Sequence, residues 1–178
     1  MNVKRKETSR MAEESFTLTT IFDSWKQYQE HIASAIAPLT AEQMTLRAAP
    51  DLRSIGELAL HIAGCRAGWF THILGEADDT PTGAAIKAMA VWDEQDRSLW
   101  NAAQLVEALG ITWEFMMDKV ARWSADDMKA TFEDDQDGVK VQLSRAWILY
   151  HLMEHDLHHG GELSLTLGMH GLTSDFPG

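Results

Sequence analysis

Four segments of the chain repeat apolar residues at three- and four-residue steps, and this repeat constrains the fold more than any other feature. Such spacing places the apolar side chains on one stripe of a helix. Helices of this kind bury their stripes by packing against one another, so the pattern predicts an all-α protein, a four-helix bundle. The four segments cover about residues 16–37, 54–74, 101–123 and 144–169.

Residues typical of helix ends support these boundaries. Ser54 and Glu57 have the three-residue spacing of a reciprocal capping box, and Asn101 and Gln104 repeat it at the third segment. Pro38 marks the end of the first segment, since proline lacks the backbone N–H that a helix needs. We therefore expect helices to begin close to residues 54 and 101.

The links between the predicted helices differ in length. Residues 76–100 form a long crossover between the second and third helices, with a short helix predicted at about 84–91. Residues 130–143 predict a small exposed hairpin between the third and fourth helices, turning at Asp137 and Gly138.

Length and composition set the remaining expectations. A chain of 178 residues fits one domain, residues 1–178, in which residues 1–14 are expected to form a flexible tail. The single cysteine excludes an internal disulfide and favours a reducing, cytoplasmic compartment. We expect no membrane partner, because no signal peptide or membrane-length apolar run appears. A net charge of −12 opposes binding to the phosphates of nucleic acid.

Histidines crowd the fourth predicted helix. Residues four apart lie one turn apart on one face, so two imidazoles at this spacing can reach one metal ion. At about 100° per residue, His155 and His159 border or enter the face that packs inward. His151 and His158 fall at the margin of that face, and Glu154 lies further out. The spacing favours His155 and His159 as a ligand pair.

A third ligand must come from another helix. His61 lies at the edge of the apolar stripe of the second helix, turned towards the bundle axis. An inward histidine is more often a hydrogen-bonded core residue, but an inward pair with an inward third histidine favours a metal site. Cys65, one turn further on, is expected to fill space in the core. Asp156 falls on the apolar side of the fourth helix and needs a partner there.

Two stretches resemble a known family. Ser-Ile-Gly-Glu-Leu-Ala-Leu-His, ending at His61, and His-Asp-Leu-His-His-Gly-Gly-Glu-Leu, beginning at His155, are similar to the DinB-like (DinB/YfiT) superfamily of metal-dependent enzymes. The resemblance runs from the first helix to Gly171. It implies a four-helix bundle with a long crossover, a homodimer, and three histidine ligands at His61, His155 and His159.

The sequence departs from that family at one point. Many relatives have Arg-Gly-Gln after the last histidine, where this chain has Gly160, Gly161 and Glu162. Some relatives use a Glu-x-x-x-His pair instead, which would correspond to Glu154 and His158. Characterised relatives include thiol-dependent transferases and isomerases, so the resemblance implies a small-molecule substrate and a low-molecular-weight thiol.

Three neutral imidazoles leave a divalent ion with an open coordination position, as in catalytic sites. Our hypothesis is a metal-dependent enzyme in which Zn²⁺ or Ni²⁺ activates water or a thiol cosubstrate for transfer or hydrolysis. Glu162 would fix the tautomer of a ligand histidine or act as a general base. The alternative is a non-catalytic helical bundle, a dimerisation or binding module with a structural or vestigial metal site. Arg66 and Arg145 are the arginines nearest the predicted site on its two helices.

Overall fold

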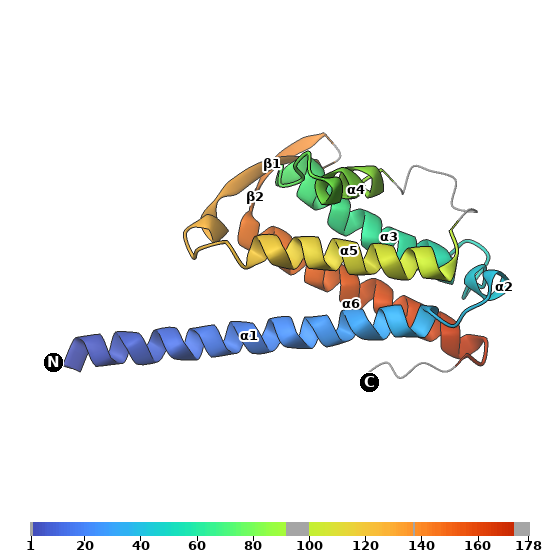
Figure 1. Ribbon diagram of the computed structural model, residues 1–178, viewed down its shortest axis with the longest axis horizontal. Coiled ribbons are helices and arrows are strands. Elements are labelled where there is room, and N and C mark those ends of the chain that lie inside the picture. Colours follow the sequence, from blue (N-terminus) through green and yellow to red (C-terminus); the bar gives the residue numbers. More distant parts are fainter. Residues whose placement is uncertain (1, 92–99, 137, 173–178) are drawn as a thin grey trace.

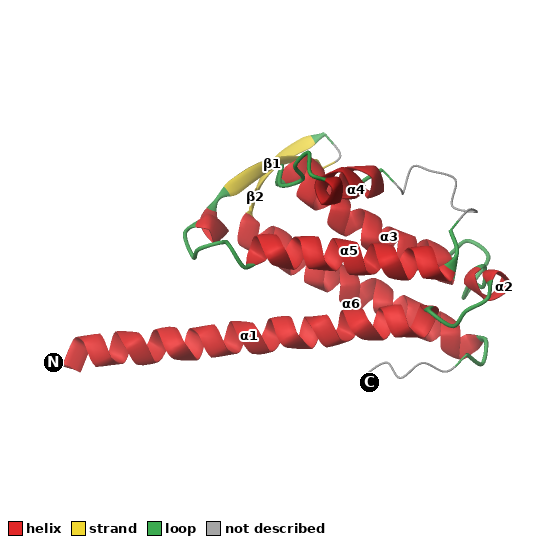
Figure 2. Cartoon of the chain, in the orientation of Figure 1, coloured by secondary structure: helices red, strands yellow, loops and turns green. Residues whose placement is uncertain are grey.

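The computed structural model describes residues 2–91, 100–136 and 138–172, and they form a mostly helical protein with one small two-stranded sheet (Figures 1 and 2). Helix α3 packs against α5 and α6, and α1 packs against the same two helices from the other side. The long helices are α1 (Asn2–Ile36), α3 (Ile55–Gly68), α5 (Ala102–Val120) and α6 (Arg145–Met169). The short ones are α2 (Ala41–Met44) and α4 (Pro81–Met89).

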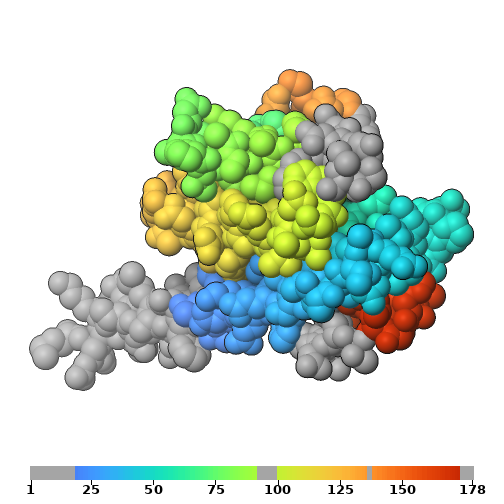
Figure 3. Space-filling model, turned by 45° about the vertical axis from the view of Figure 1, so that its right-hand side comes forward, coloured from blue at the N-terminus to red at the C-terminus, as the bar shows by residue number. Residues whose placement is uncertain are grey.

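The core lies between the long helices. Its fully buried side chains include Ile32 on α1, Ile62 on α3, Leu109 on α5 and Leu152 on α6. These residues belong to the apolar stripes predicted for the four helices or lie beside them. On the face seen in Figure 3, α5 lies between α1 and α4, which agrees with the contacts that α5 makes with both.

Helix α1 is longer than predicted. It begins at Asn2, so residues 2–14, which the sequence indicated as a flexible tail, are helical in the structure. This part of α1 extends past the other helices in Figure 1. The segment lacks an apolar stripe, which is why periodicity did not predict a helix, but its lysines, arginines and glutamates are good helix formers.

The second predicted helix ends in an unexpected turn. Helix α3 passes at Gly68 into a π-helical turn, η1 (Trp69–Ile73), in which the N–H of Leu74 donates to the carbonyl of Trp69 at 2.9 Å. Gly75 then ends the helix with φ 64°, as expected of a glycine after a helix. A π-turn inserts one residue into the helical repeat and so changes the direction of the side chains beyond it.

The crossover and the hairpin follow the sequence in outline. Helix α4 corresponds to the short helix predicted at about 84–91 and starts slightly earlier, with Thr80 as its N-cap. A 3₁₀ turn, η4 (Asp127–Lys129), leads into strand β1 (Thr131–Gln136), which pairs antiparallel with β2 (Val139–Ser144). Gly138 has φ 82°, and Asp137, the other predicted turn residue, lies outside the described residues.

No helix among the residues that the structure describes is both long enough and apolar enough to cross a membrane.

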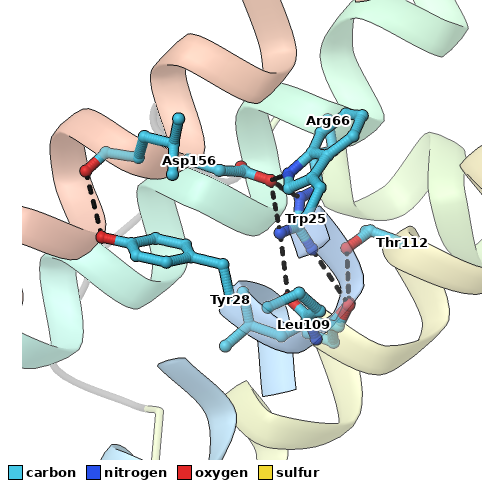
Figure 4. A network of polar contacts seen from close by, with 9 residues as sticks. Trp25, Tyr28, Arg66, Leu109, Thr112 and Asp156 are labelled. Atoms are coloured by element: carbon cyan, nitrogen blue, oxygen red, sulfur yellow. Dashed lines mark hydrogen bonds and ion pairs between the residues drawn. The ribbon is translucent and has the colours of Figure 1, made fainter. Parts of the chain in front are cut away.

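A buried ion pair joins three of the long helices. Arg66 on α3 contacts both oxygens of Asp156 on α6, its Nη2 donating to Oδ2 at 2.7 Å (Figure 4). The indole N–H of Trp25 on α1 donates to the same oxygen at 2.7 Å. Both charged side chains are only 1% exposed. This pair provides the partner that Asp156 was predicted to need.

The pKa of the Asp156 carboxyl is raised overall in this environment. Burial raises the pKa of its carboxyl, and the adjacent Arg66 guanidinium and the Trp25 indole oppose that rise. A neutral Asp156 would leave the permanently charged Arg66 buried without a counter-ion, which costs more than ionising the carboxyl. We therefore assign a charged pair at neutral pH.

Both predicted capping boxes are present. The Oγ of Ser54 accepts from the N–H of Glu57 and a Glu57 oxygen accepts from the N–H of Ser54, while Asn101 and Gln104 repeat the pattern. Arg47 adds two donors to Glu57, at 2.6 and 3.0 Å. Burial raises the pKa of Glu57, but the hydrogen bonds from Arg47 and the Ser54 backbone outweigh it and lower the pKa below its usual value.

The substitution Glu57→Gln should therefore destabilise the protein in a pH-dependent way. Glutamine can keep the capping box but not the charge facing Arg47, so we expect a loss of about 0.5–1 kcal/mol in unfolding free energy at pH 7. A carboxyl with a lowered folded-state pKa stabilises the fold above its ordinary pKa of 4.5 and loses that effect as the pH falls below it. Urea unfolding of both proteins at pH 7 and pH 4 would contradict this if the difference did not shrink.

Candidate metal centre

Three imidazoles from two helices meet at the seam between α3 and α6. His61 comes from α3, and His155 and His159 come from α6. One ring nitrogen from each lies within 4.8 Å of the others. The Nε2 atoms of His61 and His155 are 3.0 Å apart, and the three ring centroids are separated by 4.4 to 4.7 Å.

Helical geometry explains why these three histidines come together. His155 and His159 are four residues apart on α6, so their rings project from one face on successive turns. Helix α3 packs against α6 along that face and brings His61 opposite them. The three residues that the sequence predicted as ligands thus share one site.

The donor set fits a divalent ion. Zinc–nitrogen bonds of about 2.0–2.1 Å in a tetrahedral site place the ligand nitrogens about 3.3 Å apart. The 3.0 Å between His61 and His155 is close to that separation, and the nitrogen of His159 lies within 4.8 Å of both. The residues are suited to an ion that prefers imidazole, such as zinc or nickel.

The surroundings favour the neutral form of His155 and of His159. Burial lowers the pKa of His155 to about 2, and the neighbouring rings of His159 and His61 add to the effect. Burial also lowers the pKa of His159, against the opposing influence of Glu162. A neutral imidazole has the free lone pair that a metal ligand needs, so protons compete only weakly for these nitrogens near neutral pH.

Glu162 lies directly beside the triad. One of its oxygens is 2.7 Å from Nδ1 of His159, which leaves Nε2 as the nitrogen available to the site. A carboxylate in this position holds a ligand histidine in one tautomer and one orientation. The other oxygen is 3.6 Å from His158, which is largely exposed.

The alternative Glu-x-x-x-His pair does not converge. Glu154 is exposed and lies 3.8 Å from His151, while His158 faces Glu162 on another part of the helix. Among the described residues, the groups that could hold an ion are His61 with His155 and His159, and His158 with His159 and Glu162. Glu154 belongs to neither group.

An aromatic wall adjoins the triad, and the sequence did not predict it. We use this name for Trp69, Trp147 and His151. The ring of His151 stacks on Trp147 with centroids 5.1 Å apart and meets Trp69 at 5.2 Å. His151 also lies 6.1 Å from His155. Trp147 is 38% exposed, and its position eight residues before His155 on α6 was the available signal.

Neither arginine considered from the sequence is free at the site. Arg66 is buried and bound to Asp156, one layer inside the triad. Arg145 donates to Glu76 at 3.3 Å and stacks over the rings of Trp123 and Phe132. Both have structural partners, so recognition of a substrate must rely on other residues.

Comparison with known proteins identifies the family. The model of the DinB family matches residues 5–175, almost the whole chain. The chain belongs to the DinB family. A DinB-like protein of known crystal structure from Bacillus cereus has the same fold, with a TM-score of 0.58 and 21% identity over 88% of this chain and 93% of that one. No curated protein gives a significant match.

Membership of the DinB family agrees with the two motifs on which the resemblance was noted. Both motifs contribute to the triad: the first ends in His61, and the second begins with His155 and contains His159. Family and histidine cluster together are compatible with a metal-binding, enzyme-like fold.

Proposed function

We propose that this DinB-family protein is a metal-dependent enzyme in which His61, His155 and His159 hold one divalent ion, Zn²⁺ or Ni²⁺. The observation that carries the proposal is the convergence of three imidazoles from two helices. The reaction is transfer to or hydrolysis of a small molecule, with a low-molecular-weight thiol or water as the nucleophile.

The bound ion would supply Lewis acidity, which makes a water or thiol nucleophile available at neutral pH. The chain's own residues prepare the site. Glu162 accepts a hydrogen bond from Nδ1 of His159 and so orients that ring. Because His61 and His155 are only partly buried, the triad can be reached from the groove between α3 and α6.

A second set of contacts stiffens the site from inside. Arg66 and Asp156 connect α3 to α6 between one and two turns beyond His61 and directly next to His155, and Trp25 joins α1 to the same carboxylate. Such a network limits sliding of α3 against α6. It keeps the distance between the ligand histidines constant, as a preformed catalytic site requires.

The test is a reaction screen on protein stripped of metal and reloaded with Zn²⁺ or Ni²⁺. Thiol conjugation to electrophiles and hydrolysis of activated esters and amides would be followed with and without the metal. We expect turnover that appears on reloading and is lost again with a chelator. Stoichiometric metal without turnover in either reaction class would favour the non-catalytic alternative, a scaffold with a structural metal.

We expect Glu162→Gln to weaken metal binding by about 10–100-fold, because carboxylates that orient ligand histidines have effects of this size. Glutamine can still accept the hydrogen bond from Nδ1 of His159. It lacks the negative charge that makes the imidazole a stronger ligand for the metal. Competition with a chromophoric chelator would measure the affinity. An unchanged affinity with lost turnover would instead show that Glu162 acts as the general base.

A further inference from the structure

A cavity of about 380 Å³ lies beside the metal centre in the groove between α3 and α6. It forms where the loop before α3 approaches the last turns of α6. Leu58 lies one turn before His61 on α3, and Glu162 contacts His159. The cavity therefore adjoins the triad through Glu162. Its main lining residues are Leu52, Arg53, Leu58, Glu162, Leu165 and Thr166.

The cavity is close enough to the triad for one small molecule to reach both. Helix α6 rises about 1.5 Å per residue, so Thr166 lies about 10 Å along the helix from His159. Glu162 lies between them on the same groove and takes part in both sites. A ligand with a chain of a few carbon atoms can span this distance.

Arg53 is the arginine that lines this cavity. Its Nε atom is buried and has no hydrogen-bond partner, and its guanidinium forms no ion pair with a described residue. A buried donor without a partner is costly unless a ligand or water satisfies it. Arg145 also has a buried Nε without a partner, but its guanidinium pairs with Glu76. Arg47, Arg66 and Arg122 likewise pair with a carboxylate, on Glu57, Asp156 and Asp118 respectively.

The remaining lining residues indicate which anion would fit. Leu52 and Leu165 are 52% and 62% exposed, unusually high for leucines, and form apolar walls with Leu58. Glu162 carries a negative charge that already faces His159, and the exposed Asp51 adds another at the rim. Two nearby carboxylates repel a dianion more than a monoanion. A single carboxylate with an apolar body suits this cavity better than a phosphate.

We propose that Arg53 binds the carboxylate of a small organic substrate or cosubstrate whose apolar part lies against Leu52, Leu58 and Leu165. The guanidinium presents parallel N–H donors that match the two oxygens of a carboxylate. The molecule then extends along the groove towards the triad. The substrate class is thus a small apolar monocarboxylate; its role in the reaction rests on the proposed function, but its binding does not need the metal.

The proposal is tested on metal-free full-length protein, so that a carboxylate cannot bind the ion instead. Titrations of hexanoate, hexyl phosphate and hexanol would be followed by NMR through the backbone amides of Leu165 and Thr166. We expect hexanoate to bind more tightly than the other two. In Arg53→Gln its affinity should fall by about tenfold or more, the usual effect of losing a charge-assisted bond.

Two further variants make the result specific. Arg122→Gln removes one positive charge from an exposed position just past the end of α5, outside the lining of this cavity, and should leave hexanoate binding unchanged. Leu165→Glu adds a negative charge at an exposed position of the cavity and should weaken hexanoate binding. Equal binding of hexanoate by wild type and Arg53→Gln, or equal binding of hexanoate and hexanol, would overturn the proposal. Neither result would affect metal binding by the triad, which is measured separately.

Discussion

Replacing His155 with alanine is expected to abolish stoichiometric metal binding. His155 supplies one of three nitrogens in the triad, and its ring centroid lies 4.7 Å from that of His61 and 4.4 Å from that of His159. Two imidazoles from different helices bind an ion much more weakly than three, and the loss should exceed the about 10–100-fold caused by changes around a ligand. Elemental analysis and titration of chelator-treated protein with Zn²⁺ and Ni²⁺ would measure it.

His158→Ala is the matched control. This histidine lies three residues further along α6, is 65% exposed and faces Glu162 rather than the triad. We expect the variant to keep its metal with at most a small loss of affinity. Retention of metal by His155→Ala together with its loss in His158→Ala would support the Glu-x-x-x-His alternative and contradict the proposed ligands.

The substitution Asp156→Asn should lower the unfolding free energy by about 3–5 kcal/mol, the usual cost of removing one partner of a buried ion pair. Asparagine has nearly the same shape, but it leaves the Arg66 guanidinium buried without a counter-ion (Figure 4). Domains of this size are stabilised by only about 5–15 kcal/mol, so the loss is a large fraction of the total. Urea unfolding of the metal-free protein would measure it.

Two comparisons separate the buried charge from other effects. Replacing the pair together, with Arg66→Met and Asp156→Leu, should recover much of the lost stability because no unpaired charge remains. Asp118→Asn breaks an exposed pair with Arg122 on α5 and should cost less than about 1 kcal/mol. A cost for Asp156→Asn no larger than that for Asp118→Asn would show that the pair contributes little.

Features set by neighbouring residues could be predicted well. The capping boxes at Ser54 and Asn101, the short helix in the crossover and the hairpin near residues 130–143 all depend on contacts within a few residues of the chain. The start of helix α1 was predicted too late in the chain. A stretch of good helix formers without an apolar stripe gives no periodic signal.

Features that depend on contacts between helices required the structure. A helical wheel showed that Asp156 faced inward, but both Arg66 and Arg145 were available from the sequence, and only packing selected Arg66. The aromatic wall joins Trp147 and His151 on α6 to Trp69 in η1, a contact between two segments that are far apart in the sequence. The cavity at Arg53 combines a loop with the far end of α6.

For this protein, the sequence by itself determined which side of each helix a residue occupies, and this was enough to select His61, His155 and His159. Side-chain direction around a helix follows from the regular turn per residue and needs no distant contact. The axial alignment of α3 against α6 was decided only by the tertiary structure. It depends on how the side chains of all four long helices pack together in one core. A pattern within one segment of the sequence does not specify this packing.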